Sequence, residues 1–118
     1  MLHGVLPSGN NGDGTKAAPK FVDSGVPLLI TEMRRQGALK SSMYIKIAGG
    51  AHMFSVPGTD GSLNIGERNV AATHAAMERE GIAVAAADVG GNCGRTVQLF
   101  VDSGKVVVRM AGGAITEL

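Results

Sequence analysis

Aromatic residues, cysteine and long hydrophobic runs are all scarce in this sequence. It has no Trp, one Tyr and three Phe in 118 residues, so its core must be built from aliphatic side chains. Cys93 is the only cysteine, which excludes an internal disulfide and fits a reducing cytoplasm. No apolar run approaches the roughly 20 residues of a membrane helix, and residues 1–4 lack the features of a signal peptide. The composition therefore predicts a cytoplasmic protein without membrane insertion.

The sequence also lacks an excess of charge of one sign. It has 11 basic and 10 acidic residues, which give a net charge of +1. No basic cluster stands out beyond Arg34 and Arg35, which is too little to follow a phosphate backbone. His3, His52 and His74 lack the carboxylate spacing of a metal site. The sequence therefore predicts no nucleic-acid partner, no metal and no cofactor.

Glycine is abundant, with 18 residues, and together with Asn, Asp and Pro it separates the expected elements. A first helix is predicted from the apolar spacing of Val26 to Met33, with Asp23 or Ser24 as its cap and Pro27 in its first turn. Gly37 should end it. A second helix is predicted from Asn64, with Glu67 completing a capping box, to Gly81.

Strands are predicted over the alternating or continuous apolar stretches that remain. The predicted strands are Tyr44–Ala48, Ile82–Val89, Thr96–Asp102 and Lys105–Met110, the last two joined by a two-residue turn at Ser103-Gly104. Helices alternating with strands and followed by a hairpin indicate an α/β domain with a mixed sheet. One domain spanning 1–118 is expected at this length.

Two segments suggest chemistry when read residue by residue. Asn10–Gly14 has some character of a calcium loop, but Asp13 is its only acidic residue, so an ordinary loop is favoured. Gly90–Arg95 is rich in glycine but lacks the Lys-Ser/Thr of a phosphate loop, which favours a turn. Cys93 in that turn could be a nucleophile with His52 or His74 as base, although a lone cysteine specifies a site poorly.

Eight blocks, in order and with near-family spacing, resemble the CheD family of chemoreceptor glutamine deamidases. The blocks are His3–Pro7, Lys20–Asp23, Ala48–Phe54, Asn64–Val70, Gly81–Ile82, Asp88–Asn92, Gly94–Arg95 and Gly104–Val106. They run from His3 to about Arg109, nearly the whole chain. The resemblance implies an α/β sandwich of the CheD type.

The resemblance also implies a reaction, in which a thiolate attacks the side-chain amide of a receptor glutamine and water then releases glutamate. The family's base is the His of a His-x-x-Leu-Pro block, which corresponds to His3. Its nucleophile is the Cys of a Gly-Ser-Cys turn upstream of that block, and a Thr near the turn completes the set. Neither the turn nor the Thr is found in this sequence, and Cys93 occupies a variable position with no family role.

The sequence is therefore expected to be an N-terminally incomplete CheD-like domain, without its first strands. Partners expected from the resemblance are the cytoplasmic helices of methyl-accepting chemoreceptors and a CheC-type phosphatase. Two functions stay open at this point. One is deamidation by the parent protein; the alternative is a non-catalytic module that binds receptors or the phosphatase.

Overall fold

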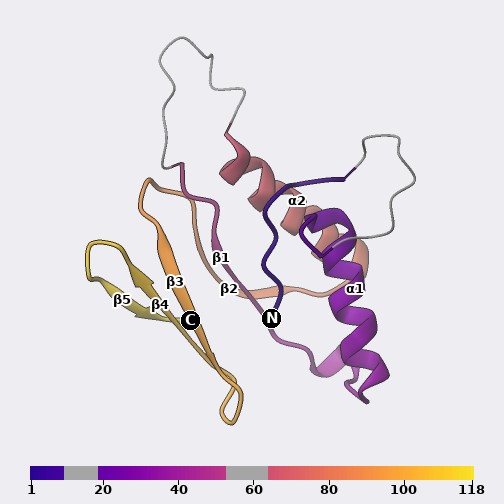
Figure 1. The fold of residues 1–118 in the computed structure, drawn as a ribbon. Helices are drawn as coiled ribbons and strands as arrows, with labels where there is room; N and C mark the ends of the chain where they lie inside the picture. The colour runs from indigo at the N-terminus through magenta and orange to yellow at the C-terminus, as the bar shows by residue number, and fades with distance from the viewer. Residues whose placement is uncertain (10–18, 53–63) are drawn as a thin grey trace.

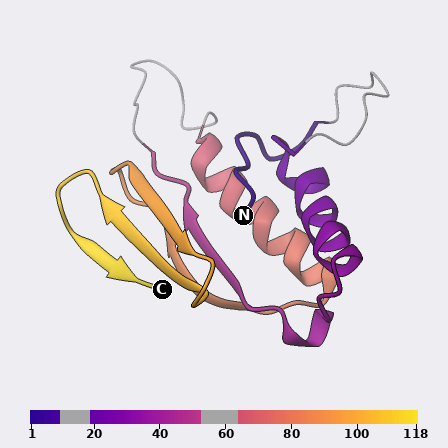
Figure 2. The ribbon, with the colours of Figure 1, turned by 60° about the horizontal axis from the view of Figure 1, so that its bottom comes forward.

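The computed structural model describes residues 1–9, 19–52 and 64–118, and it confirms an α/β sandwich. The elements, in chain order, are α1 (Val22–Arg35), the 3₁₀ helix η1 (Lys40–Ser42), β1 (Ile45–Gly49), α2 (Ile65–Glu80), β2 (Val84–Val89), β3 (Arg95–Phe100), β4 (Lys105–Met110) and β5 (Ile115–Glu117). Figures 1 and 2 show three layers, with both helices on one side, β1 and β2 in the middle, and β3 to β5 on the other side. No helix within the described ranges has the length and apolarity to cross a bilayer. Asn10–Gly14 lies outside the described residues.

The strands form two sheets of different type. β1 and β2 are parallel, with Ile45 opposite Val84 and Gly49 opposite Val89. The second sheet is antiparallel, in the order β3-β4-β5. The parallel pair follows from α2, because a crossover helix between two strands returns the chain in the same direction. The predicted mixture of pairing types is thus present, divided between two sheets.

The first helix departs from the prediction at its start. α1 begins at Val22 after Phe21, and no side chain caps it, so Asp23 and Ser24 lie inside its first turn instead of before it. Pro27 lies inside the helix and not in its first turn. Because proline has no N–H, one helical hydrogen bond is lost there.

The second helix, α2, begins and ends where the sequence predicts. The Asn64 side chain accepts a hydrogen bond from the Glu67 N–H at 3.1 Å, which is the N-cap half of the predicted capping box. The Glu67 carboxylate returns to Asn64 as predicted, but it accepts from the Asn64 side-chain amide at 3.0 Å and not from the backbone N–H. Gly81 ends the helix at φ 66°, a left-handed conformation that glycine adopts without strain.

The loop that joins β3 and β4 is longer than predicted. β3 ends at Phe100, which pairs with Lys105, so the connection is the four residues Val101–Gly104 and not a two-residue turn. The Gly104 N–H closes this loop with a 2.8 Å hydrogen bond to the Phe100 carbonyl. β5 was not predicted, because its three residues are too few to show a period.

Most of the buried core lies between the helices and the parallel strands. Its members are Val22, Val26, Ile30, Ala76, Met77 and Ile82. Ile45 and Val84 pack against this cluster from the central sheet. Since side chains alternate along a strand, Lys46 next to Ile45 points to the opposite face, toward the antiparallel sheet. Its ammonium group donates to the Leu118 carbonyl at 2.7 Å.

Candidate active site

His3 lies on an extended N-terminal segment, residues 2–7, that runs beside the start of α1 (Figure 1). Leu2 packs against the helical core. Gly4 approaches α1 so closely that an added Cβ would lie 2.7 Å from Cγ2 of Val22. The residues on both sides of His3 are therefore held against the core, while His3 itself is exposed.

Backbone hydrogen bonds fix the same segment to the chain that enters α1. The Val5 N–H donates to the Lys20 carbonyl at 2.8 Å, and the Val22 N–H donates to the Leu6 carbonyl at 2.9 Å. The Asp23 N–H donates to the Pro7 carbonyl at 3.2 Å. These bonds occupy two of the free amides at the start of α1, which explains why the helix needs no side-chain cap.

A side chain from α2 holds the segment from the other side. The Asn69 side-chain amide donates a 2.9 Å hydrogen bond to the Val5 carbonyl, across 64 positions of sequence. Sequence reasoning missed Asn69, although it stands within the Asn64–Val70 block, because a contact over this distance leaves no local pattern. His3 thus extends from a segment that both helices position, and an exposed imidazole placed in this way can exchange a proton with an incoming group.

A second feature lies where the parallel strands end. A cavity of about 270 Å³ opens beside the N-terminus of α2. Its lining residues are Gly50, His52, Asn64, Glu67, Val70, Val89, Gly90 and Gly91. His52 is thus the histidine among the described residues that lines this cavity. Crevices beyond the carboxyl ends of parallel strands are common ligand sites in α/β folds.

The turn after β2 lines this cavity with its first two residues, Gly90 and Gly91, and Arg95 stabilises the turn. The Arg95 guanidinium bonds the Asp88 carboxylate at 2.8 Å and the Gly90 carbonyl at 2.8 Å. Its side chain is only 7% exposed and that of Asp88 is 12% exposed, so the ion pair is largely shielded from water. Gly90 and Gly91 take φ values of 77° and 70°, which confirms that this turn requires glycine.

Cys93 is exposed at the end of that turn. Its thiol contacts the Asn92 side-chain oxygen at 3.5 Å. Within the described residues, no hydrogen bond joins Cys93 to His52 or His74, and His74 is exposed on α2. The described residues therefore pair neither of these histidines with the cysteine. Nor do the described residues gather three or more potential metal ligands.

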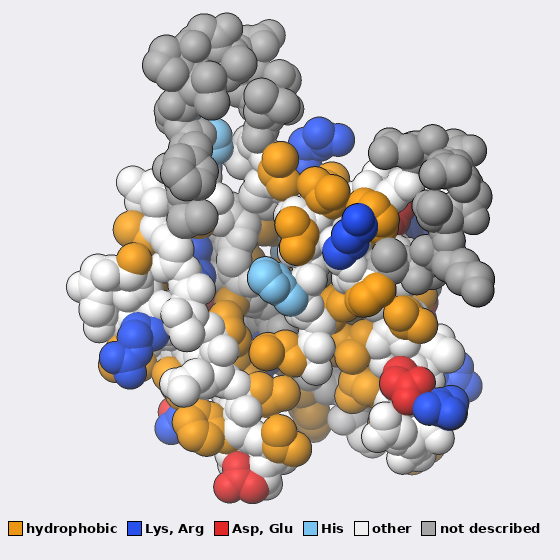
Figure 3. All heavy atoms as spheres, viewed as in Figure 1, with side chains coloured by type: hydrophobic (Ala, Val, Ile, Leu, Met, Phe, Trp, Pro, Cys, Tyr) orange, Lys and Arg blue, Asp and Glu red, His pale blue; other side chains and the backbone are white. Residues whose placement is uncertain are grey.

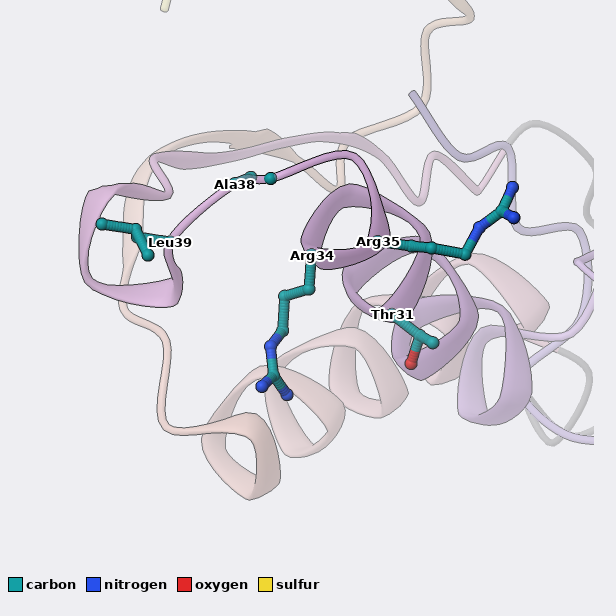
Figure 4. A pocket seen from close by; sticks show the side chains of 6 residues that line it. Thr31, Arg34, Arg35, Ala38 and Leu39 are labelled. Carbon is teal, nitrogen blue, oxygen red and sulfur yellow. The ribbon is translucent and has the colours of Figure 1, made fainter.

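A second hollow, of about 500 Å³, lies at the C-terminal end of α1. Thr31, Arg34, Arg35 and Leu39 are among its lining residues. Figure 4 shows Arg34 and Arg35 leaving the helix in different directions. Their guanidinium groups do not converge on one position, so this hollow lacks the convergent polar groups of a ligand site.

Comparisons with known proteins point to one family, and the matches cover nearly the whole chain. A family model described as "CheD chemotactic sensory transduction" matches residues 5–110. A protein of Symbiobacterium thermophilum is 41% identical over all of this chain and 72% of its own length. One from Caldanaerobacter subterraneus is 38% identical over 98% of this chain and 71% of its own length. Both are named "Probable chemoreceptor glutamine deamidase CheD".

Proposed function

Because this chain belongs to the CheD family, we propose that it takes part in hydrolysis of the side-chain amides of chemoreceptor glutamines to glutamate. The names of its relatives support this reaction. The structural observation that carries the proposal is the exposed imidazole of His3 on a segment held by both helices. Proton transfer requires this kind of placement, since the base must stay within hydrogen-bonding reach of the reacting atoms.

His3 is the proposed general base. It takes the proton of a cysteine thiol, and the thiolate attacks the carbonyl carbon of the glutamine amide. The protonated imidazole then returns the proton to the nitrogen, which leaves as ammonia while a thioester remains. Water attacks the thioester, His3 accepts a proton from that water, and the thiol is regenerated as glutamate is released.

The thiol of this reaction is expected from outside the 118 residues, in a Gly-Ser-Cys turn with its neighbouring Thr. Cys93 is not assigned this role, because its thiol contacts only Asn92 among the hydrogen bonds of the described residues. The proposed setting is the cytoplasm, where the cytoplasmic helices of methyl-accepting chemoreceptors are the substrate. A CheC-type phosphatase is the second proposed partner.

The first test is the DNA upstream of the Met1 codon, which we expect to encode an in-frame Gly-Ser-Cys segment. The protein including that segment is then incubated with a receptor cytoplasmic domain, and glutamine-to-glutamate conversion is followed by mass spectrometry. We expect conversion, its loss in His3→Gln, and no change in Cys93→Ser. His74→Gln is the matched control, because His74 is an exposed histidine outside the anchored segment.

Three results would contradict parts of this proposal. Absence of an in-frame Gly-Ser-Cys segment would overturn the expected source of the thiol. Conversion that survives His3→Gln would remove His3 as the base. Conversion that is lost in Cys93→Ser would show that Cys93 is the nucleophile after all.

A further inference from the structure

Asn69 on α2 combines a long-range hydrogen bond with a buried atom that has no partner. Its side-chain nitrogen donates to the Val5 carbonyl at 2.9 Å. Its side-chain oxygen is buried and makes no hydrogen bond with any residue that the structure describes. Native proteins leave few buried polar atoms unpaired, so each one needs an explanation.

The direction of the amide explains the unpaired oxygen. A backbone carbonyl can only accept, so the NH₂ group of Asn69 must face the Val5 carbonyl and the oxygen must face away from it. Burying that oxygen without a donor disfavours the folded state. The favourable contribution of Asn69 must therefore come from its donor, which acts on the segment that carries His3.

The segment is held unequally on its two sides. Toward α1 it has several backbone hydrogen bonds, including Val5 N–H to the Lys20 carbonyl at 2.8 Å. Toward α2, within the described residues, Asn69 provides the one side-chain hydrogen bond that reaches residues 2–7. Val5 stands two residues from His3, so a change at the Val5 carbonyl alters the direction of the backbone from which His3 extends.

We propose that Asn69 is a positioning residue for His3, which fixes the imidazole for proton transfer without touching the substrate. The proposal rests on the proposed function of His3. Small misplacements of a catalytic group lower the rate strongly, by about 100-fold for 1 Å. Loss of the Asn69 hydrogen bond should therefore reduce kcat more than it changes KM or the stability of the fold.

Two substitutions separate positioning from stability. Asn69→Leu is close to Asn in size, removes the donor and also removes the unpaired buried oxygen, so its melting temperature should stay near that of the unchanged protein. Asn69→Asp replaces the donor by an oxygen that repels the Val5 carbonyl. Asn92→Asp is the matched control, since Asn92 is exposed and uses only its oxygen, as an acceptor from the Cys93 thiol at 3.5 Å.

The first measurement is hydrogen exchange, on the 118-residue chain, of the Val5 and Leu6 amides. Both donate to the Lys20 carbonyl, at 2.8 and 3.1 Å, and both should exchange faster in the Asn69 variants. Amides in the middle of α1 should keep their protection, which shows that the opening is local. The Asn92→Asp control should match the unchanged protein at both places.

The second measurement is deamidation kinetics in the protein that includes the upstream thiol segment. We expect kcat to fall by about 10- to 100-fold in both Asn69 variants, with KM within about twofold. Unchanged exchange, or faster exchange with unchanged kcat, would overturn the proposal. If the unsubstituted protein shows no deamidation, the proposed function fails, and exchange at Val5 and Leu6 still decides whether Asn69 holds the His3 segment.

Discussion

The helical half of this molecule and its antiparallel sheet are both rich in aliphatic residues, yet they bury them very differently. The helices and parallel strands enclose six buried hydrophobic residues in one cluster. In the antiparallel sheet and its loops, by contrast, Val108 is fully buried while Leu99, Phe100, Val101 and Ile115 are exposed. Figure 3 shows hydrophobic side chains in a band down the middle of one face. Burial therefore depends on a second layer that covers the apolar face, and composition alone does not decide it.

The proposed site belongs to the well-packed half. His3 is held over α1 and α2, where the neighbouring Leu2 joins the buried cluster. The antiparallel sheet contributes one side of the cavity near His52 through the turn that precedes β3. A rigid layer thus carries the proposed base, which is what precise positioning requires.

An ion pair of Asp88 on β2 with Arg95 on β3 links the two halves. We expect Asp88→Ala to lower the free energy of unfolding by about 4 kcal/mol, because it leaves a buried guanidinium without its counter-charge. Urea denaturation measures this loss. Asp102→Ala, in the exposed β3–β4 loop, is the control and should have little effect. Equal losses in the two variants would show that the pair does not join the halves.

The sequence predicted this molecule best where an element is determined by its own residues. The N-cap at Asn64 and the stop at Gly81 were both confirmed, because each acts within one turn of α2. The predicted cap at the start of α1 was wrong. The first amides of this helix donate to the Leu6 and Pro7 carbonyls of a distant segment and not to a local side-chain cap.

In the candidate site, too, the sequence failed to predict contacts between distant segments. His3 was found only through its family block, and its exposure on an anchored segment required the structure. Asn69 and the Asp88–Arg95 pair escaped notice because their partners lie on other elements. Neither contact has a spacing that a linear pattern could show.

A comparison of two aliphatic truncations tests the difference between the halves directly. Ile30 is 3% exposed in the helical cluster, whereas Leu99 on β3 is 40% exposed. We expect Ile30→Ala to lower the free energy of unfolding by about 3 kcal/mol, from lost apolar burial and the cavity that remains. Leu99→Ala should cost less than about half as much, because much of its surface already contacts water. Urea denaturation of both variants decides this, and a larger loss at Leu99 would reverse the comparison.

The smallest effect is expected from an ion pair on the outside of the helical half. Glu32 bonds Arg35 at 2.8 Å, one helical turn along α1, and both side chains are largely exposed, at 45% and 76%. The Arg35 guanidinium, with a smaller contribution from the Gln36 amide, holds the pKa of the Glu32 carboxyl below its ordinary value. The pair stabilises the fold when the carboxylate is ionised in both states, above the ordinary carboxyl pKa. That stabilisation disappears as the pH falls through the lowered pKa of the folded protein.

Glu32→Gln should therefore lower the melting temperature slightly at about pH 7, and the difference from the unchanged protein should vanish at about pH 2. It should also shrink in about 1 M salt, where exposed charges are screened over roughly 3 Å. Thermal unfolding at both pH values, with Glu78→Gln as an exposed control on α2, gives the measurement. A difference that grows toward acid pH, or one that exceeds the effect of Ile30→Ala, would mean that surface charge and not the buried cluster dominates the stability of the helical half.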